Sequence, residues 1–417
     1  MIKYRKIHFF LSLFVSLIPL ALVAGAAVME FFIILSCFTF FFLNYKKIGL
    51  DYYKKFFFII FLVFNFHLIL SSILSENIFN SLKNTLFYFR FGILAILICY
   101  LLDNFKKFKI LFFYSLMVTL TIVIFYSIVD FLIFSDHSLS DRLSGLFGKE
   151  KIQGSFLLRI TPIFIILYFY NKEYLTKIFH FIFYTILTLI FILIILSGER
   201  AAIFLMFIGI SLVFLFLKMN LKKIFFYFLL SISIFTLTIS FYPNFKERII
   251  DQTYDQFFIT TDIDLNIISH KLNFFSQGHE EHFRTAIIMF KKNYLKGVGV
   301  RNFRNECKKD IYKKVGMYYC TTHPHNSYMQ ILSETGLIGF SFFMIFLIFI
   351  FRKIYEFLRN IYTKDQKINS SLGICFVIIL INFFPLVPTG SFFNNWLSTL
   401  YFMPIGFLLY ELNYKRF

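Results

Sequence analysis

Charged residues are scarce in this chain of 417 residues. Only 16% of its positions are Asp, Glu, Lys or Arg, whereas soluble globular domains carry about 25%. Hydrophobic residues make up 59% of the sequence, and phenylalanine alone contributes 66 of them. This composition excludes an ordinary soluble domain and indicates a chain whose apolar side chains face lipid.

Acidic residues are the rarer of the charged types, with 23 Asp and Glu against 42 Lys and Arg. In a soluble protein the resulting net charge of +19 would suggest nucleic acid as a partner. Here no nucleic-acid-binding motif accompanies the charge, and the basic residues lie in the breaks between apolar runs. There they orient the chain and face anionic lipid head groups. We therefore expect membrane lipids as partners and no nucleic acid.

Segments of alternating polarity, which an outer-membrane barrel needs, are not seen, and neither are internal repeats. Instead, the sequence contains recurring apolar runs of roughly the 20 residues that a helix needs to cross a bilayer. Because backbone polar groups cannot stay unpaired in lipid, these runs must be helical. The sequence thus predicts an all-α polytopic membrane protein of about twelve crossings, at residues 8–27, 29–44, 55–75, 84–102, 110–134, 154–170, 178–196, 201–217, 224–242, 328–351, 369–388 and 393–411.

The distribution of Lys and Arg predicts the orientation, since cytoplasmic loops of membrane proteins are enriched in these residues. They concentrate at both ends of the chain and in the breaks that follow even-numbered crossings. We therefore expect a multi-pass membrane protein with both termini in the cytoplasm.

One break is far longer than the others. Residues 243–325 contain no spanning run, and the topology places them in the periplasm, between the ninth and tenth crossings. Aromatic and aliphatic residues throughout this loop predict a small folded cap inserted in a single transmembrane domain, residues 1–417. The stretch Phe283–Leu295 has apolar positions at helical spacing and is expected to lie along the membrane surface.

Cysteine is rare, with five residues in the chain. Three of them fall inside predicted crossings, where a small apolar side chain is the plain explanation. Cys307 and Cys320 are in the long loop, where an oxidising periplasm would allow a disulfide. Free thiols or a shared metal are the alternatives. We favour the disulfide and expect no metal site, because no Cys-x-x-Cys or matched His pair is present.

Charged side chains within or beside a membrane span are costly, so each needs an explanation. Arg90 and Arg159 lie inside predicted crossings, where either an ion pair in the bundle or a functional contact would explain them. Glu199 and Arg200 lie where two apolar runs meet, and an ordinary polar turn is an equal alternative to a functional role. Glu334 lies inside the tenth predicted crossing.

The polar segment most suggestive of chemistry lies where the long loop enters the tenth crossing. His323 and His325 bracket a proline there. A helix N-terminus at this point would favour a nearby phosphate, and a neutral imidazole could act as a general base. A helix cap or a place among lipid head groups is the alternative for these histidines.

His325-Asn326, nine further residues and Gly336-Leu-Ile-Gly339 match the H-N-x9-G-x-x-G signature of O-antigen ligases at each fixed position. Three further elements resemble that family in the expected order. They are Asp141–Gly148, the Ser197-Gly-Glu-Arg200-Ala element, and Arg284 followed by Lys296-Gly-Val-Gly299. The resemblance covers about residues 140–345, which we take as the catalytic region.

The resemblance implies a fold like that of lipid-dependent membrane glycosyltransferases. It also implies a reaction without metal or cofactor, in which a glycan moves from undecaprenyl diphosphate to an acceptor hydroxyl. The acceptor would be lipid A-core or another glycan, and the reaction would serve lipopolysaccharide biosynthesis on the periplasmic face of the bacterial inner membrane. In this chemistry a base takes the proton of the acceptor, and arginines stabilise the departing diphosphate.

The resemblance assigns these roles to residues of this chain. The base is His325, and the diphosphate-binding candidates are Arg200, Arg284 and Arg142. Supporting roles are expected for His323, Asn326, Glu334 and Glu199. The motif glycines, Gly336 and Gly339, are expected to allow close helix packing.

An O-antigen polymerase, which uses the same donor with a lipid-linked glycan as acceptor, is the nearest alternative. Such polymerases often carry R-x10-G motifs in external loops, and Arg142, Arg284, Arg301 and Arg304 are not followed by glycine at that spacing. A transporter or flippase is the alternative from another class. Transporters tend to show repeats and polar residues near the midplane, whereas the reactive residues here gather at one face.

Overall fold

The computed structural model describes residues 5–45, 50–54, 56–133, 142–218, 220–241, 243–258, 260–262, 267–269, 275–363 and 369–414. Both chain ends, whose cytoplasmic location the sequence predicts, lie outside these residues. So do Asp141 and residue 134, the end of the fifth predicted crossing.

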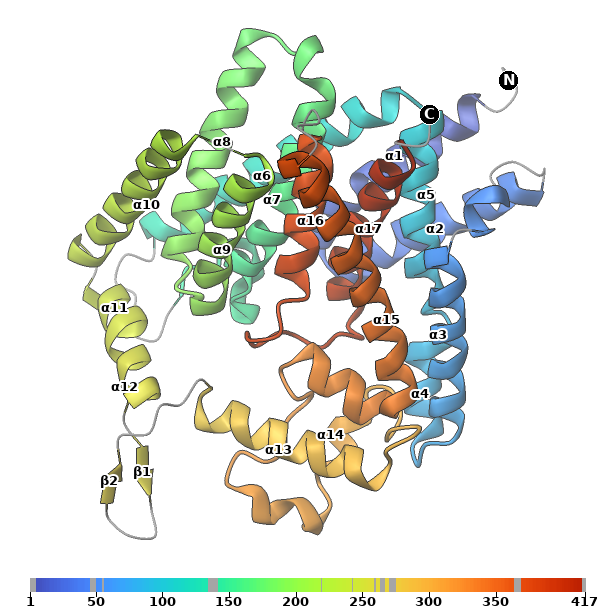
Figure 1. The fold of residues 1–417 in the computed structure, drawn as a ribbon, viewed down its shortest axis with the longest axis vertical. Coiled ribbons are helices and arrows are strands. Elements are labelled where there is room, and N and C mark those ends of the chain that lie inside the picture. The colour runs from blue at the N-terminus through green and yellow to red at the C-terminus, as the bar shows by residue number, and fades with distance from the viewer. Residues whose placement is uncertain are drawn as a thin grey trace. The chain divides into compact units, whose positions relative to one another are not determined.

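Helices make up nearly all of the described chain (Figure 1). Each predicted crossing corresponds to one of them: α1 (Arg5–Ala24), α2 (Ala26–Tyr45), α3 (Phe56–Ile73), α5 (Phe89–Asn104), α6 (Lys107–Ile133), α7 (Gln153–Asn171), α8 (Lys177–Leu196), α9 (Arg200–Phe216), α10 (Leu221–Phe241), α15 (Ser327–Thr363), α16 (Ser370–Asn382) and α17 (Asn395–Tyr414). Eight helices of the described chain are long and apolar enough to cross a bilayer. An all-α polytopic membrane architecture is confirmed, whereas the number of twelve crossings stays a prediction.

The remaining α-helices are α4 (Ile78–Thr85), α11 (Pro243–Lys246), α12 (Gln252–Phe258), α13 (Gln277–Lys292) and α14 (Phe303–Glu306), and the strands are β1 (Thr260–Asp262) and β2 (Ile267–Ser269). Short 3-10 helices lie at Leu50–Lys54, Gly145–Glu150, Lys172–Tyr174 and Asp310–Val315. The two strands pair antiparallel, with Thr261 opposite Ile268. A π-helical turn, Glu247–Asp251, joins α11 to α12.

The chain forms two compact units. Unit 1 comprises residues 1–116 and 278–417, and unit 2 comprises residues 117–277. In unit 1, α5 packs along α17, and α3 packs along α15. Helix α5 is buried on all sides from Phe91 to Leu102, as its uniformly apolar sequence requires. In unit 2, α7 packs against α8 and α9.

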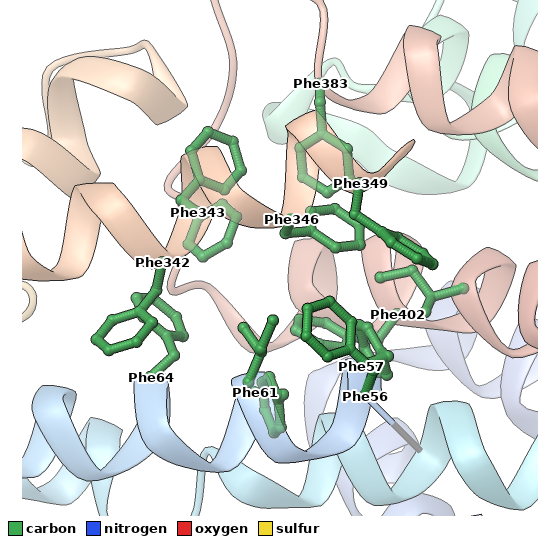
Figure 2. Close-up of a pocket in the computed structure, with 13 residues that line it drawn as sticks. Phe56, Phe57, Phe61, Phe64, Phe342, Phe343, Phe346, Phe349, Phe383 and Phe402 are labelled. Atoms are coloured by element: carbon green, nitrogen blue, oxygen red, sulfur yellow. The ribbon is translucent and has the colours of Figure 1, made fainter. Parts of the chain in front are cut away.

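An apolar pocket lies in unit 1 among residues of α3, α15, α17 and the segment between α16 and α17 (Figure 2). The volume of the cavity is about 60 Å³, and eleven phenylalanines and two isoleucines line it. Such a lining suits a hydrocarbon chain. It offers no hydrogen bond to a sugar or a phosphate, so the polar chemistry must be sought elsewhere.

Helix α15 is interrupted at Gly336, whose backbone has φ 67° and ψ −169°. The N–H groups of Val298 and Gly299 donate to the carbonyls of Ser333 and Glu334, at 3.0 and 2.9 Å. The preceding loop therefore satisfies backbone groups that the break leaves free, which a helix interruption at membrane depth requires.

The two motif glycines allow close approaches. A Cβ atom on Gly336 would overlap the carbonyl of Leu295, and the positive φ also disfavours other residues there. A Cβ on Gly339 would crowd the side chains of Thr335 and His67. His67 of α3 donates from Nε2 to the carbonyl of Thr335 at 2.8 Å. The G-x-x-G pattern thus holds α15 against α3 and the loop before it.

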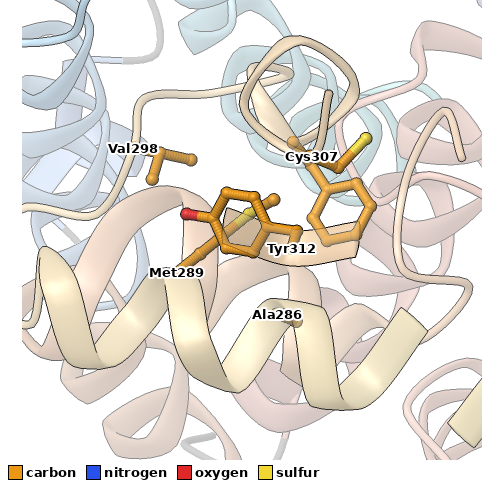
Figure 3. Packing of buried hydrophobic residues seen from close by; sticks show 6 residues of the cluster. Ala286, Met289, Val298, Cys307 and Tyr312 are labelled. Atoms are coloured by element: carbon orange, nitrogen blue, oxygen red, sulfur yellow. The ribbon is translucent and has the colours of Figure 1, made fainter. Parts of the chain in front are cut away.

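The predicted loop 243–325 is divided between the two units, with residues 243–277 in unit 2 and residues 278–325 in unit 1. Residues 278–325, called the cap below, contain a small core (Figure 3). Ala286 and Met289 of α13 pack there with Val298, Phe303, Cys307 and Tyr312. Cys307 and Cys320 form a disulfide, which ties the end of α14 to the segment that leads to the histidines. Helix α13 lies over most of the stretch in which the sequence predicts a helix. Its place at a membrane surface stays a prediction.

Candidate functional site

The His325-Asn326 pair forms the entry to α15. Asn326 caps the helix, because its Oδ1 accepts the N–H groups of Tyr328 and Met329 at 2.9 and 3.2 Å. His325 has a positive φ of 54°, a conformation that is uncommon outside glycine and needs support from its surroundings. Its carbonyl accepts the N–H of Thr389 at 2.8 Å.

The loop between α16 and α17 holds this turn from the other side. Asn326 donates from Nδ2 to the carbonyl of Pro385 at 2.8 Å. Gln330, one turn into α15, donates to the Ser391 hydroxyl at 3.0 Å and accepts the N–H of Phe392 at 2.8 Å. The backbone at His325 is therefore fixed by two segments that lie far apart in the sequence.

Four histidines gather around the turn. The ring centroid of His325 lies 4.1 Å from that of His323, 5.4 Å from that of His282 and 5.5 Å from that of His279. His279 and His282 come from α13, and the sequence analysis missed them. They are three residues apart on a helix and therefore lie on one face of it. This spacing is the sequence signal that could have identified them. Across the described chain, no group of three or more His, Cys, Asp or Glu is placed to hold a metal ion.

Three of these histidines have a lowered pKa and are therefore mainly neutral near pH 7. Burial lowers the pKa of His325. Burial, and then the neighbouring His325, lower the pKa of His282 to about 4 and that of His323 to about 3. The ring of His325 makes no hydrogen bond within the described parts of the chain, so its basic nitrogen is free to accept a proton.

Glu334 serves the backbone of the cap. It is fully buried, and its carboxylate accepts the N–H groups of Arg301 and Phe303 at 2.9 and 3.3 Å. Gln330 donates to the same carboxylate at 3.0 Å. Glu334 thus connects α15 to the start of α14, and its contacts give it a supporting role.

Arg284 does not face the histidine cluster. Its guanidinium pairs with Glu280, one turn earlier on α13, at 2.5 Å, and its side chain is 63% exposed. It lies two positions after His282 on the helix, and side chains at that spacing do not face each other. The structure therefore offers no observation that brings Arg284 to His325.

In unit 2, Glu199 caps α7. Its carboxylate accepts the N–H of Gly154 and the hydroxyl of Ser155, both at 2.6 Å. Burial raises the pKa of Glu199, whereas these hydrogen bonds and the charge of Arg159 lower it. Arg159 also donates to the carbonyl of Ser155 at 3.0 Å. Both charged residues thus fix the start of α7 next to the turn at residues 197–200.

Three arginines surround that turn. Arg248 donates from Nε to the carbonyl of Gly198 at 3.1 Å. Arg142 also borders Gly198, and Arg200 contacts Thr253 at 3.3 Å. Burial, then the charges of Arg142 and Arg200, lower the pKa of Arg248 to about 10. Like charges held together in this way form an anion-binding arrangement.

Arg248 is a member that the sequence analysis missed, because it lies in the long loop and follows no motif. Among the described residues, no carboxylate forms an ion pair with any of the three arginines. The cluster can therefore still receive an anion.

Arg90 has a structural explanation. It donates from Nε and from NH2 to the carboxylate of Glu30 on α2, at 3.0 and 2.8 Å. Its guanidinium also lies 4.3 Å from the centre of the Phe91 ring. This bidentate pair joins α5 to α2 inside unit 1 and accounts for a charge within a predicted crossing.

The family comparison agrees with the motifs. The family model of the O-antigen ligases matches residues 185–344, a range that contains Arg200, Arg284, His325 and both motif glycines and leaves out Arg142. No curated protein matches the chain significantly. The resemblance based on the histidine signature is thereby confirmed, because residues 185–344 of this polytopic membrane protein are similar to the O-antigen ligases.

Proposed function

We propose that this protein is an O-antigen ligase that transfers a glycan from undecaprenyl diphosphate to an acceptor hydroxyl of lipid A-core on the periplasmic face. The observation that carries the proposal is His325. Its ring is neutral and unbonded among the described residues, and a held turn places it at the N-terminus of α15 within the family match.

His325 is the proposed general base. As the acceptor oxygen attacks the anomeric carbon of the glycan, its proton passes to a ring nitrogen of His325. A base acts in this way only while it is neutral, and the lowered pKa of His325 keeps it so. His279, His282 and His323 surround the ring and limit its orientations.

Arg142, Arg200 and Arg248 are the proposed diphosphate site. The bond between the anomeric carbon and the diphosphate breaks as the new glycosidic bond forms, and the electron pair leaves with the phosphate oxygen. Negative charge on the diphosphate grows in this step, and preformed cations stabilise it. A direct displacement inverts the anomeric carbon. Arg284 remains a candidate for binding the diphosphate. To do so, it would have to break its ion pair with Glu280.

The polymerase alternative differs only in the acceptor. Every role proposed for His325 and the three arginines would serve it equally, because the donor is the same. The transporter alternative loses support, because the charges that suggested it have local partners. Arg90 pairs with Glu30, and Arg159 lies beside Glu199.

The test uses cells that make a lipid-linked polysaccharide and lack their own ligase. Wild-type protein is expected to restore long-chain lipopolysaccharide, and His325→Ala and Arg200→Ala are expected to lose it. Lys313→Ala, which changes an exposed residue of the cap, is the expression-matched control. Activity that survives both substitutions would overturn the site assignment.

A second readout separates an acceptor mismatch from a failure of the proposal. Membranes that contain the protein are supplied with the lipid-linked donor, either alone or together with lipid A-core. Release of undecaprenyl diphosphate that requires lipid A-core identifies a ligase. Release from the donor alone identifies a polymerase, and no release in either case contradicts both.

A further inference from the structure

Two arginines of the cap lie close together and have no role in the proposed chemistry. Arg301 has a positive φ of 58°, and its guanidinium donates from NH1 to Oδ1 of Asn84 at 2.8 Å. Arg304 lies one turn further along. Burial, and then the charge of Arg304, lower the pKa of Arg301, so the two cations are near neighbours.

The acidic residues around this pair have other partners. Glu334 accepts the backbone N–H groups of Arg301 and Phe303. Glu306 pairs with Lys309 at 2.7 Å. Among the described residues, neither Arg301 nor Arg304 forms an ion pair with a carboxylate. Two half-buried guanidinium groups therefore remain without an ion pair, although the charge of Glu334 acts on Arg301 and offsets part of the lowering of its pKa.

Unsatisfied hydrogen-bonding atoms accompany this charge. Nε of Arg304 and Nε2 of His323 are buried and have no hydrogen-bond partner in the described chain. Buried polar atoms normally find partners, and those that lack one often mark a place for a ligand or water. Independently of the charges, these atoms indicate that a hydrogen-bonding group is missing here.

The pair adjoins the histidine cluster. The charge of Arg304 contributes to the low pKa of His323, and the ring of His323 lies 4.1 Å from that of His325. All four residues belong to unit 1. An anion bound by Arg301 and Arg304 would therefore lie near the proposed base.

We propose that Arg301 and Arg304, together with Nε2 of His323, bind an acidic substituent of the acceptor glycan, a phosphate or a carboxylate, and so orient its hydroxyl toward His325. The acceptor is the fitting source, because the base must approach the acceptor oxygen. A planar guanidinium binds such groups through two parallel hydrogen bonds. This inference rests on the proposed function, and it adds that the acceptor is acidic near the reacting hydroxyl.

The first test measures binding and needs no transfer reaction. Full-length protein in detergent is titrated with mannose 6-phosphate, mannose and inorganic phosphate, each to about 10 mM, a range that saturates a site with a Kd near 1 mM. Mannose 6-phosphate is expected to bind at least tenfold more tightly than either of the others. Equal binding of mannose would overturn the anion site, and equal binding of inorganic phosphate would overturn its assignment to an acceptor.

Variants locate the site. Arg304→Gln and Arg301→Gln are each expected to weaken mannose 6-phosphate binding about tenfold, roughly the loss of one charge-assisted contact. Arg304→Lys keeps the positive charge but loses the planar guanidinium that can make two parallel hydrogen bonds. Its affinity for mannose 6-phosphate is expected to lie between those of the glutamine variants and wild type. Lys308→Gln removes an exposed charge from the same segment and is expected to bind as wild type does. Wild-type affinity in both glutamine variants would overturn the proposal.

The second test uses transfer to lipid A-core, either phosphorylated or treated with a phosphatase. Arg304→Gln is expected to lower kcat/KM for the phosphorylated acceptor about tenfold, because both binding and orientation of this acceptor depend on the contact, and to leave kcat/KM for the treated acceptor unaffected. An equal effect on both acceptors would overturn the assignment. If wild type transfers to neither acceptor, the ligase proposal fails, whereas the binding titration still decides the anion site.

Discussion

At the scale of single residues, His325 combines a fixed backbone with a free ring. Replacing it with alanine removes the proposed base and leaves the arginines of unit 2 intact. We expect His325→Ala to lower the transfer rate by about 10²–10⁴, the usual contribution of a general base. The measurement is release of undecaprenyl diphosphate from the lipid-linked donor. An unchanged rate in a correctly inserted variant would contradict the assignment.

The pH dependence of transfer follows from the same ring. Because burial lowers the pKa of His325 below its usual 6.5, the neutral base persists into mildly acidic solution. We expect the transfer rate to fall on acidification with a midpoint below pH 6.5, and His325→Ala to lose this limb of the profile. A midpoint above that value would show that His325 is not the titrating base.

Sequence reasoning reached some of these residues and missed others for a physical reason. His325 stands in a motif whose fixed positions are local. His279 and His282 reach it only because α13 packs over the entry to α15. Their spacing puts both on one face of a helix, but it does not indicate what that face contacts. Arg248 likewise meets Arg142 through the fold of unit 2. Arg284 has a matching sequence position, yet its local partner, Glu280, decides where it points.

At the scale of elements, the break in α15 depends on Gly336. An alanine there would need a backbone of positive φ and would overlap the carbonyl of Leu295. The strain alone costs about 1–3 kcal/mol, and the overlap forces the loop away from α15. We expect Gly336→Ala to lower the thermal unfolding midpoint and the yield of folded protein. Gly278→Ala is the control, because its Cβ would meet Tyr318 at an ordinary 3.7 Å.

The disulfide of the cap stabilises the segment that leads to the histidines at the start of α15. It joins Cys307, in the small core, to Cys320, which precedes the histidines. We expect Cys307→Ser with Cys320→Ser to destabilise the cap by about 2–4 kcal/mol. Limited proteolysis would then cleave residues 278–325 faster than in wild type, whereas Cys99→Ser, inside α5, would leave that rate unchanged. Equal cleavage in the double variant would contradict this role.

At the scale of the whole molecule, hydropathy predicted a helix for every crossing, because apolar runs in lipid have no other regular structure. Hydropathy predicted the number of membrane-spanning helices less reliably. Helix α9 has 17 residues and α16 has 13, shorter than the roughly 20 that a bilayer core requires. Hydropathy also could not predict the break in α15 at Gly336, because the groups that hydrogen-bond to the backbone around the break come from residues 294–299 and from His67.

Stability of the folded protein should depend on pH through the histidine cluster. Burial lowers the pKa of His282 to about 4 and that of His323 to about 3, whereas both titrate near 6.5 in an unfolded chain. Between those values the unfolded chain binds more protons than the folded protein does. The free energy of unfolding therefore falls as pH drops below about 6.5 and is constant above it.

We accordingly expect the thermal unfolding midpoint of the purified protein to fall between about pH 7 and about pH 5. His282→Gln and His323→Gln each remove a group that takes up a proton on unfolding, so each should flatten this dependence. Lys313→Gln removes no group that titrates in this range and should keep the wild-type slope. If both histidine variants retained that slope, the protons would be taken up elsewhere in the chain.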